Sequence, residues 1–155
     1  MIDSIFISEM AKYLQGKFEP KAPHKYVGDV TNIQFRSSWE LKAFIWCDTT
    51  DAVLKWNSEE LVIPYISPVD NRPHRYFVDL VIQIKDKSGK EQFYVVEIKP
   101  KKQTELPKVP NRVSQRYIKE IETYSVNQAK WLAAIEWCDK NNMKFQILTE
   151  KELGV

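Results

Sequence analysis

Residues 74–99 read HRYFVDLVIQIKDKSGKEQFYVVEIK, and this stretch decides how the rest of the chain can be arranged. Two runs rich in β-branched and aromatic residues, 74–84 and 92–99, flank the turn-forming residues 87–89. The pattern predicts an antiparallel hairpin centred on Ser88. In that register the facing pairs are Asp79 with Glu97, Phe77 with Lys99, and Val81 with Val95.

Asp79 and Glu97 therefore bring two carboxylates to one spot. Directly opposed side chains lie roughly 4.5–5.5 Å apart at Cβ, where like charges are destabilising, so the pair needs a cation. Lys99 follows Glu97 by two residues and projects from the same face of its strand. A structural ion pair between Lys99 and one carboxylate is the alternative interpretation.

Strand alternation gives the hairpin two largely apolar faces, so helices should cover both. One face carries Val78, Leu80, Ile82, Tyr94, Val96 and Ile98, and the other carries Phe77, Val81, Val95 and Phe93.

The composition favours one folded domain spanning residues 1–155. Its 155 residues are 43% hydrophobic and 28% charged, and no apolar run reaches the roughly 20 residues of a membrane span. Met1 is not followed by a signal-like sequence, so we expect a cytoplasmic protein without membrane contact. Cys47 and Cys138 have neither the number nor the spacing of a zinc or disulfide framework, and we expect both in the core.

Periodicity and turn residues predict an α/β fold, in which a central mixed sheet is flanked by helices. A helix over 4–14 should lead into an extended connector, these two making up residues 1–27. A second helix should begin at Ser37 or Ser38, and the most regular one should span 126–141 with Ala129, Leu132, Ala133, Ile135, Trp137 and Cys138 facing inward. The remaining expected elements are strands 53–56, 60–65 and 144–148, a turn over 68–71 and a short helix within 113–124.

Glu40, in the first turn of the second helix, is the candidate third acid of the site. Taken singly, an acid at this position is more often a helix-capping residue. Combined with Asp79 and Glu97 it offers hard oxygen ligands without histidine or thiolate, which favours magnesium, or manganese as a substitute. Lys99 would add a compact positive charge able to orient water or stabilise a developing negative charge on phosphate.

The segment after the hairpin is strongly basic. Residues 99–119 contain seven lysines and arginines against Glu105 alone, although the whole chain has a net charge of only +2. Beside an acidic spot such a run suits a phosphate-binding lip, and a solvated face is the alternative. The candidate nucleic-acid contacts are Arg36, His74, Arg75, Lys101, Lys102, Lys108, Arg112 and Arg116. Neither His24 nor His74 is placed like a metal ligand.

Asp79 followed by Glu97-Ile98-Lys99 resembles the PD-(D/E)XK nuclease signature, with Val78 in place of the motif's proline. Further blocks agree in order and spacing: residues 35–40, 56–60, 63–65, 74–79 and 96–100. Together they are similar to the head-completion nucleases of T-even-like phages, a family related to the N-terminal domain of the transposon endonuclease subunit TnsA. The likeness runs from about Gly16 to the C-terminus.

The resemblance implies a restriction-endonuclease-like fold in which the residues matching Glu40, Asp79 and Glu97 hold metal, with the backbone carbonyl of Ile98. It implies that Lys99 assists hydrolysis. Gln128 and Lys130 match accessory polar positions of related nucleases, and an exposed helix face is the alternative for both. TnsA has a second domain that this chain lacks, so a stand-alone phage protein is favoured.

We therefore expect a magnesium-dependent DNA endonuclease that acts in phage head completion after packaging, in the cytoplasm of the infected host or associated with the virion. DNA is the expected partner, with capsid or portal proteins as further candidates, and the oligomeric state is left open. A TnsA-like transposition subunit is one alternative. A non-catalytic protein that binds DNA or caps the head is another.

Overall fold

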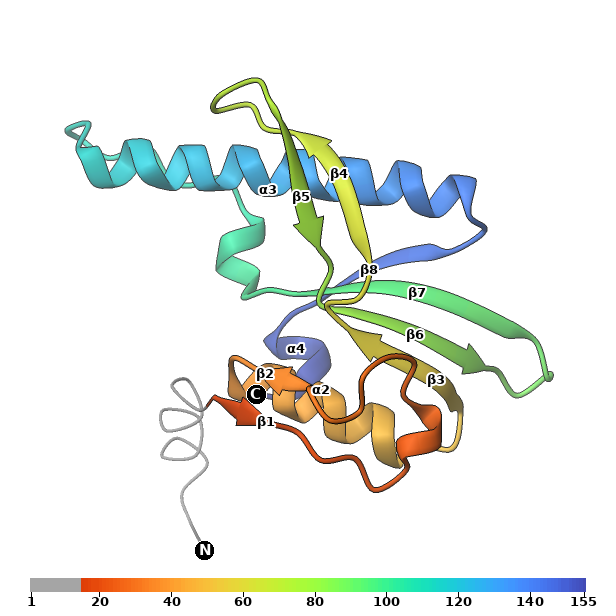
Figure 1. The fold of residues 1–155 in the computed structure, drawn as a ribbon. Helices are drawn as coiled ribbons and strands as arrows, with labels where there is room; N and C mark the ends of the chain where they lie inside the picture. Colours follow the sequence, from red (N-terminus) through yellow and green to blue (C-terminus); the bar gives the residue numbers. More distant parts are fainter. Residues whose placement is uncertain (1–14) are drawn as a thin grey trace, which may run out of the picture.

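The computed structural model describes residues 15–155 (Figure 1), and the helix expected over 4–14 lies outside them. The strands are β1 (Gly16–Lys17), β2 (Gln34–Phe35), β3 (Val53–Ser58), β4 (Val62–Ile66), β5 (Pro73–Phe77), β6 (Leu80–Lys85), β7 (Glu91–Ile98) and β8 (Lys144–Leu148). The helices are α2 (Ser38–Thr49), α3 (Gln115–Lys140) and α4 (Glu150–Leu153), with 3-10 turns η1 (Pro23–Lys25) and η2 (Lys101–Thr104).

The central sheet has four strands in the order β3-β6-β7-β8. The β3–β6 and β6–β7 pairs are antiparallel and the β7–β8 pair is parallel, so the sheet is mixed. Val81 lies opposite Val95, which confirms the register predicted for the hairpin. With helices on both faces, this is the α/β arrangement expected of a restriction-endonuclease-like fold.

The run 74–84 is not one strand, contrary to the prediction. It divides at Val78 and Asp79 into β5, which pairs with β4, and β6, which pairs with β3 and β7. Phe77 therefore lies opposite Val62 and not opposite Lys99. The backbone N–H of Val78 donates to the carbonyl of Leu61 at 3.1 Å, so the chain crosses to the two-stranded β4–β5 ribbon at this point.

Helix α2 covers one face of the sheet and begins as expected. The hydroxyl of its N-cap, Ser37, accepts a hydrogen bond from the N–H of Glu40 at 3.2 Å. Phe44 packs against Trp56 from β3, with ring centroids 5.3 Å apart. This first core cluster also contains Cys47, Leu80, Ile82 and Val96.

Helix α3 covers the other face as one continuous helix of 26 residues, where two helices were expected. Its buried side chains are Asn127, Trp131, Ala134 and Cys138. The predicted inward phase was therefore wrong at Leu132 and Ile135, which are exposed, because the buried stripe lies one position away. The second core cluster places Trp131, Ala134 and Cys138 against Ile63, Tyr65, Tyr76, Val78 and Val95.

Val78 consequently packs on the α3 side, opposite to the face predicted for it, because the chain has already left the sheet there. Cys47 and Cys138 are both buried and unpaired, as expected.

The expected extended connector has more structure than predicted, since it contributes β1 and η1. It is fastened to the end of α2 by Lys25, whose ammonium group donates to the carbonyl of Thr50 at 2.8 Å. A cation near the C-terminal carbonyls of a helix is favourable. No helix within residues 15–155 is long and apolar enough to cross a membrane.

Candidate active site

Asp79 and Glu97 lie where β6 begins and β7 ends, beside the base of the β4–β5 ribbon (Figure 1). Asp79 directly precedes β6, and its Oδ2 accepts a hydrogen bond from the N–H of Ile98 at 2.7 Å. Burial, and then the charge of Glu97, raise the pKa of Asp79 well above its ordinary value. The two carboxylates therefore share one site, as the register predicted.

Each carboxylate oxygen of Glu97 has one partner. The hydroxyl of Tyr76 donates to Oε2 at 2.5 Å, and the ammonium group of Lys99 lies 3.3 Å from Oε1. Glu97 is buried, and the Lys99 side chain is 22% exposed, so the lysine is accessible from solvent while still paired. The hairpin thus brings Asp79, Glu97 and Lys99 together.

Glu40 lies near the pair but is occupied by its own helix. Its Oε2 accepts a hydrogen bond from the backbone N–H of Arg36 at 2.6 Å, so it makes a contact of the kind that a helix-capping acid makes. Burial raises its pKa, and its charge contributes to the raised pKa of Asp79. Within residues 15–155 no three His, Cys, Asp or Glu side chains converge as a ready metal-binding cluster.

The donor set nevertheless suits a hard cation. Glu40 and Glu97 are buried and Asp79 is partly buried, and among residues 15–155 the cation that pairs with this group is Lys99, through Glu97. Arg36 does not balance the excess, because its side chain is 65% exposed and pairs with Glu59 at 3.2 Å. Buried carboxylates in excess of their cations, with no nearby imidazole or thiolate, match the oxygen ligands of magnesium.

The candidate nucleic-acid contacts are spread over the surface. His74 pairs with Asp70 at 2.8 Å, and the guanidinium of Arg75 lies 5.5 Å from the ring centroid of Phe77. Arg116 pairs with Glu120 at 3.2 Å. The other members of the basic segment are exposed on η2 and on the loop before α3: Lys101, Lys102, Lys108 and Arg112. The structure thus gives these residues the exposure that phosphate contact requires.

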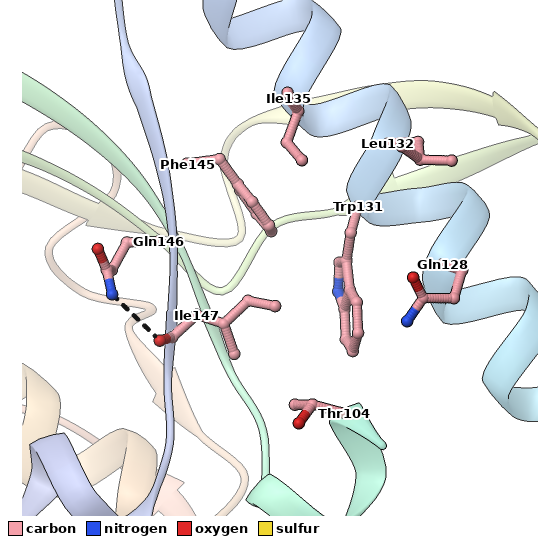
Figure 2. A pocket seen from close by; sticks show the side chains of 8 residues that line it. All are labelled: Thr104, Gln128, Trp131, Leu132, Ile135, Phe145, Gln146 and Ile147. Carbon is pink, nitrogen blue, oxygen red and sulfur yellow. Dashed lines mark hydrogen bonds between the residues drawn. The ribbon is translucent and has the colours of Figure 1, made fainter. Parts of the chain in front are cut away.

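The two accessory residues lie in different surroundings. Gln128 lines a groove of about 480 Å³ between α3, η2 and β8, where Figure 2 shows it across from Thr104 and beside Trp131. The residues that line this groove do not include Glu40, Asp79, Glu97 or Lys99. Lys130 instead lies over two aromatic rings of the ribbon, with its Nζ 5.9 Å from the ring centroid of Tyr65 and 5.7 Å from that of Tyr76. It is therefore not simply a solvated residue.

Tyr76 is the site residue that the sequence did not reveal. In the linear pattern it is one apolar-facing position of a strand, three residues before Asp79. Its contact with Glu97 arises because β5 lies outside the central sheet, so that the Tyr76 side chain can reach Glu97 on β7. A buried tyrosine whose hydroxyl must find a partner was the available signal.

Comparison with known proteins identifies the family. The model of the TnsA-like endonuclease N-terminal family matches residues 50–150, which include Asp79, Glu97 and Lys99. A curated relative, the head completion nuclease of Enterobacteria phage T4, is 44% identical over 142 residues, covering 89% of this chain and 92% of that protein. The chain therefore belongs to the TnsA-like endonuclease N-terminal family.

Proposed function

We propose that the chain is a magnesium-dependent DNA endonuclease that acts in phage head completion. The observation that carries the proposal is the meeting of Asp79, Glu97 and Lys99 where β6 begins and β7 ends. The name of the T4 relative supports the nuclease activity and the stage of assembly, and its coverage of nearly both whole chains supports transferring them. Capsid or portal proteins are the partners that such a role would require.

Asp79, Glu97 and the carbonyl of Ile98 would hold the metal, with Glu40 as the outermost acid. Since magnesium usually keeps several of its waters, Glu40 could act through one of them without leaving its helix cap. The chemistry supplied by a metal held there would be activation of water and neutralisation of charge on the attacked phosphate. Manganese would serve as a substitute because it accepts the same ligands.

Lys99 would steady the attacked phosphate. Its ammonium group already lies beside the acid pair and is accessible from solvent, so a phosphate oxygen can approach it. The basic residues of η2 and the following loop would hold the DNA outside the reacting centre.

The family match gives one further candidate, a strand-cleaving subunit of a transposition system, because the matched family takes its name from TnsA. The chemistry would be the same, and the genes adjoining the coding sequence would separate the two roles.

Nicking of supercoiled plasmid DNA, in magnesium and in chelator, tests the activity. The parent protein should cut only with metal. Lys99→Ala should lose at least about 100-fold in rate while still folding, since Lys99 follows the last residue of β7 and packs in neither core cluster. Lys90→Ala, which removes an exposed lysine from the turn of the same hairpin, is the matched control and should cut normally.

Failure would take either of two forms. If the parent binds DNA but never cuts it with magnesium or manganese, the protein is a non-catalytic cap. If Lys99→Ala cuts like Lys90→Ala, then the ion pair with Glu97 is only structural.

A further inference from the structure

Tyr76 lies at the meeting point of three parts of the fold. It belongs to β5 of the ribbon, its ring is buried in the core cluster beneath α3, and its hydroxyl reaches Glu97 on β7. At 3% exposure it has no access to DNA, so any effect on the reaction must pass through Glu97.

The hydrogen bond from Tyr76 has one direction. A phenol carries its proton at neutral pH and a carboxylate can only accept, so the Tyr76 hydroxyl donates to Oε2 of Glu97. A hydroxyl that donates to a carboxylate makes a charge-assisted bond, which is short and strong. Oε2 is therefore fixed, while Oε1 stays on the side of Lys99.

Lys130 lies over the ring of the same tyrosine. Its ammonium group lies 5.7 Å from the ring centroid of Tyr76, within the roughly 6 Å over which a cation acts on an aromatic face. Positive charge over a phenol ring draws electron density from it and makes the hydroxyl a better donor. The chain of contacts runs from α3 through the ribbon to the acid pair.

We propose that Tyr76 is a positioning residue, supported by Lys130, which holds the Glu97 carboxylate with Oε1 directed to the cation site shared with Asp79. This inference rests on the proposed function, because it concerns the same metal site. Removal of a group that orients a ligating carboxylate typically lowers metal affinity or activity by about 10-fold to 100-fold. Tyr76 should fall in that range, and it differs from the acids in touching neither metal nor DNA.

Tyr76→Phe is the principal test, with Tyr65→Phe as its matched control. Tyr65 lies on β4 beneath the same lysine, and its hydroxyl is not bonded to Glu97 in the described part of the chain. The measurements are manganese affinity by calorimetry, the magnesium concentration for half-maximal cutting, and DNA affinity in chelator. Tyr76→Phe should weaken manganese binding and raise the magnesium requirement by about 10-fold to 100-fold, leaving DNA affinity unchanged. Excess magnesium should restore much of the rate.

Lys130→Met provides a second variant that keeps the buried tyrosine in place. Removing the charge while retaining the length of the side chain should weaken manganese binding by about twofold to fivefold. Parental manganese affinity in this variant would overturn the part assigned to Lys130. The Lys130→Met variant also keeps the proposal testable if Tyr76→Phe folds poorly.

The outcomes separate this inference from the proposed function. A parent that binds manganese and cuts, beside a Tyr76→Phe protein of equal affinity and magnesium requirement, would overturn the positioning role alone. So would a Tyr76→Phe protein that loses only thermal stability, because the bond would then merely tie the ribbon to the sheet. A parent that binds no metal would overturn the proposed function, and the role of Tyr76 with it.

Discussion

Asp79 occupies a position where burial and a neighbouring charge both oppose its ionisation. The N–H of Ile98 and the charge of Lys99 offset this only in part, and the pKa of Asp79 is raised well above its ordinary value. A carboxyl with a raised pKa binds its proton more tightly in the folded state than in the unfolded chain. Its stabilising contribution is therefore present below the unfolded value of about 4 and is lost as pH rises through the folded value.

Asp79→Asn should accordingly melt at least as high as the parent in chelator at pH 7. Between about pH 4 and neutrality the parent should lose stability relative to the variant, because only the parent acquires the buried charge. Thermal unfolding in chelator across this range measures the difference. Asp51→Asn, at an exposed aspartate, is the control and should follow the parent. A parent-to-variant difference that does not change with pH would contradict the prediction.

At the scale of single residues, the sequence was sufficient to place Asp79 beside Glu97 and Lys99, because hairpin register is fixed by alternation and by the turn. The same alternation could not show that Tyr76 reaches Glu97. That contact depends on the break between β5 and β6, which no pattern of side chains between 74 and 84 predicts.

Among the elements, α2 carries Glu40 and is held at its start by Ser37. The Ser37 hydroxyl accepts the N–H of Glu40, and the Glu40 carboxylate accepts the N–H of Arg36, so cap and site residue share one turn. Loss of a serine cap typically costs about 1 kcal/mol.

Ser37→Ala should lower the free energy of unfolding by about 1 kcal/mol, as measured by urea denaturation. Ser38→Ala, at the first helical residue, is the control and should change it much less. Equal effects of the two substitutions would show that the cap does not define the start of α2.

The basic residues of η2 give a separate prediction. Lys101 and Lys102 are exposed directly after the β7 strand that carries Glu97. If both contact phosphate, their replacement by alanine should flatten the slope of log affinity against log salt by about 0.9 for each, or about two units together. Lys87 and Lys90, replaced together, remove the same charge from the exposed hairpin turn and are the control. Unchanged affinity and slope would identify the η2 lysines as a solvated face.

Helix phase shows why the elements were harder to predict than the acid pair. Leu132 and Ile135 are apolar yet exposed, whereas Asn127 is buried on α3. Hydrophobicity alone therefore moved the predicted stripe by one position, and only the packing of Trp131 against the ribbon decides it. The short helix expected within 113–124 is likewise the first part of the continuous α3.

At the scale of the whole molecule, the sheet separates two core clusters, each with one buried cysteine. Cys47 belongs to the cluster under α2 and Cys138 to the cluster under α3. Burial raises the pKa of the Cys47 thiol to about 12 and that of Cys138 to about 11. Since the thiolate is the reactive form, both should be inert in the folded protein.

A thiol reagent at pH 8 should therefore leave both cysteines unmodified until the protein unfolds. Cys47→Ala and Cys138→Ala leave one thiol each, so the modification rate against urea concentration reports on one cluster at a time. If the domain unfolds as a unit, the thiol of each variant should become reactive at the urea concentration at which that same variant loses its helical signal. Earlier modification of one thiol would show that the two cores open separately.

The exposed turn between β6 and β7, closed by hydrogen bonds between Asp86 and Lys90, separates Asp79 from Glu97 along the chain. A polypeptide divided after Lys87 would carry Asp79 and Glu40 on its first fragment, and Glu97 and Lys99 on its second. Neither fragment has a complete set of acids, and the β6–β7 pairing is what would reunite them. Cutting of DNA by the mixed fragments would then report their association through the β6–β7 pairing and through the packing of α3 on the β4–β5 ribbon.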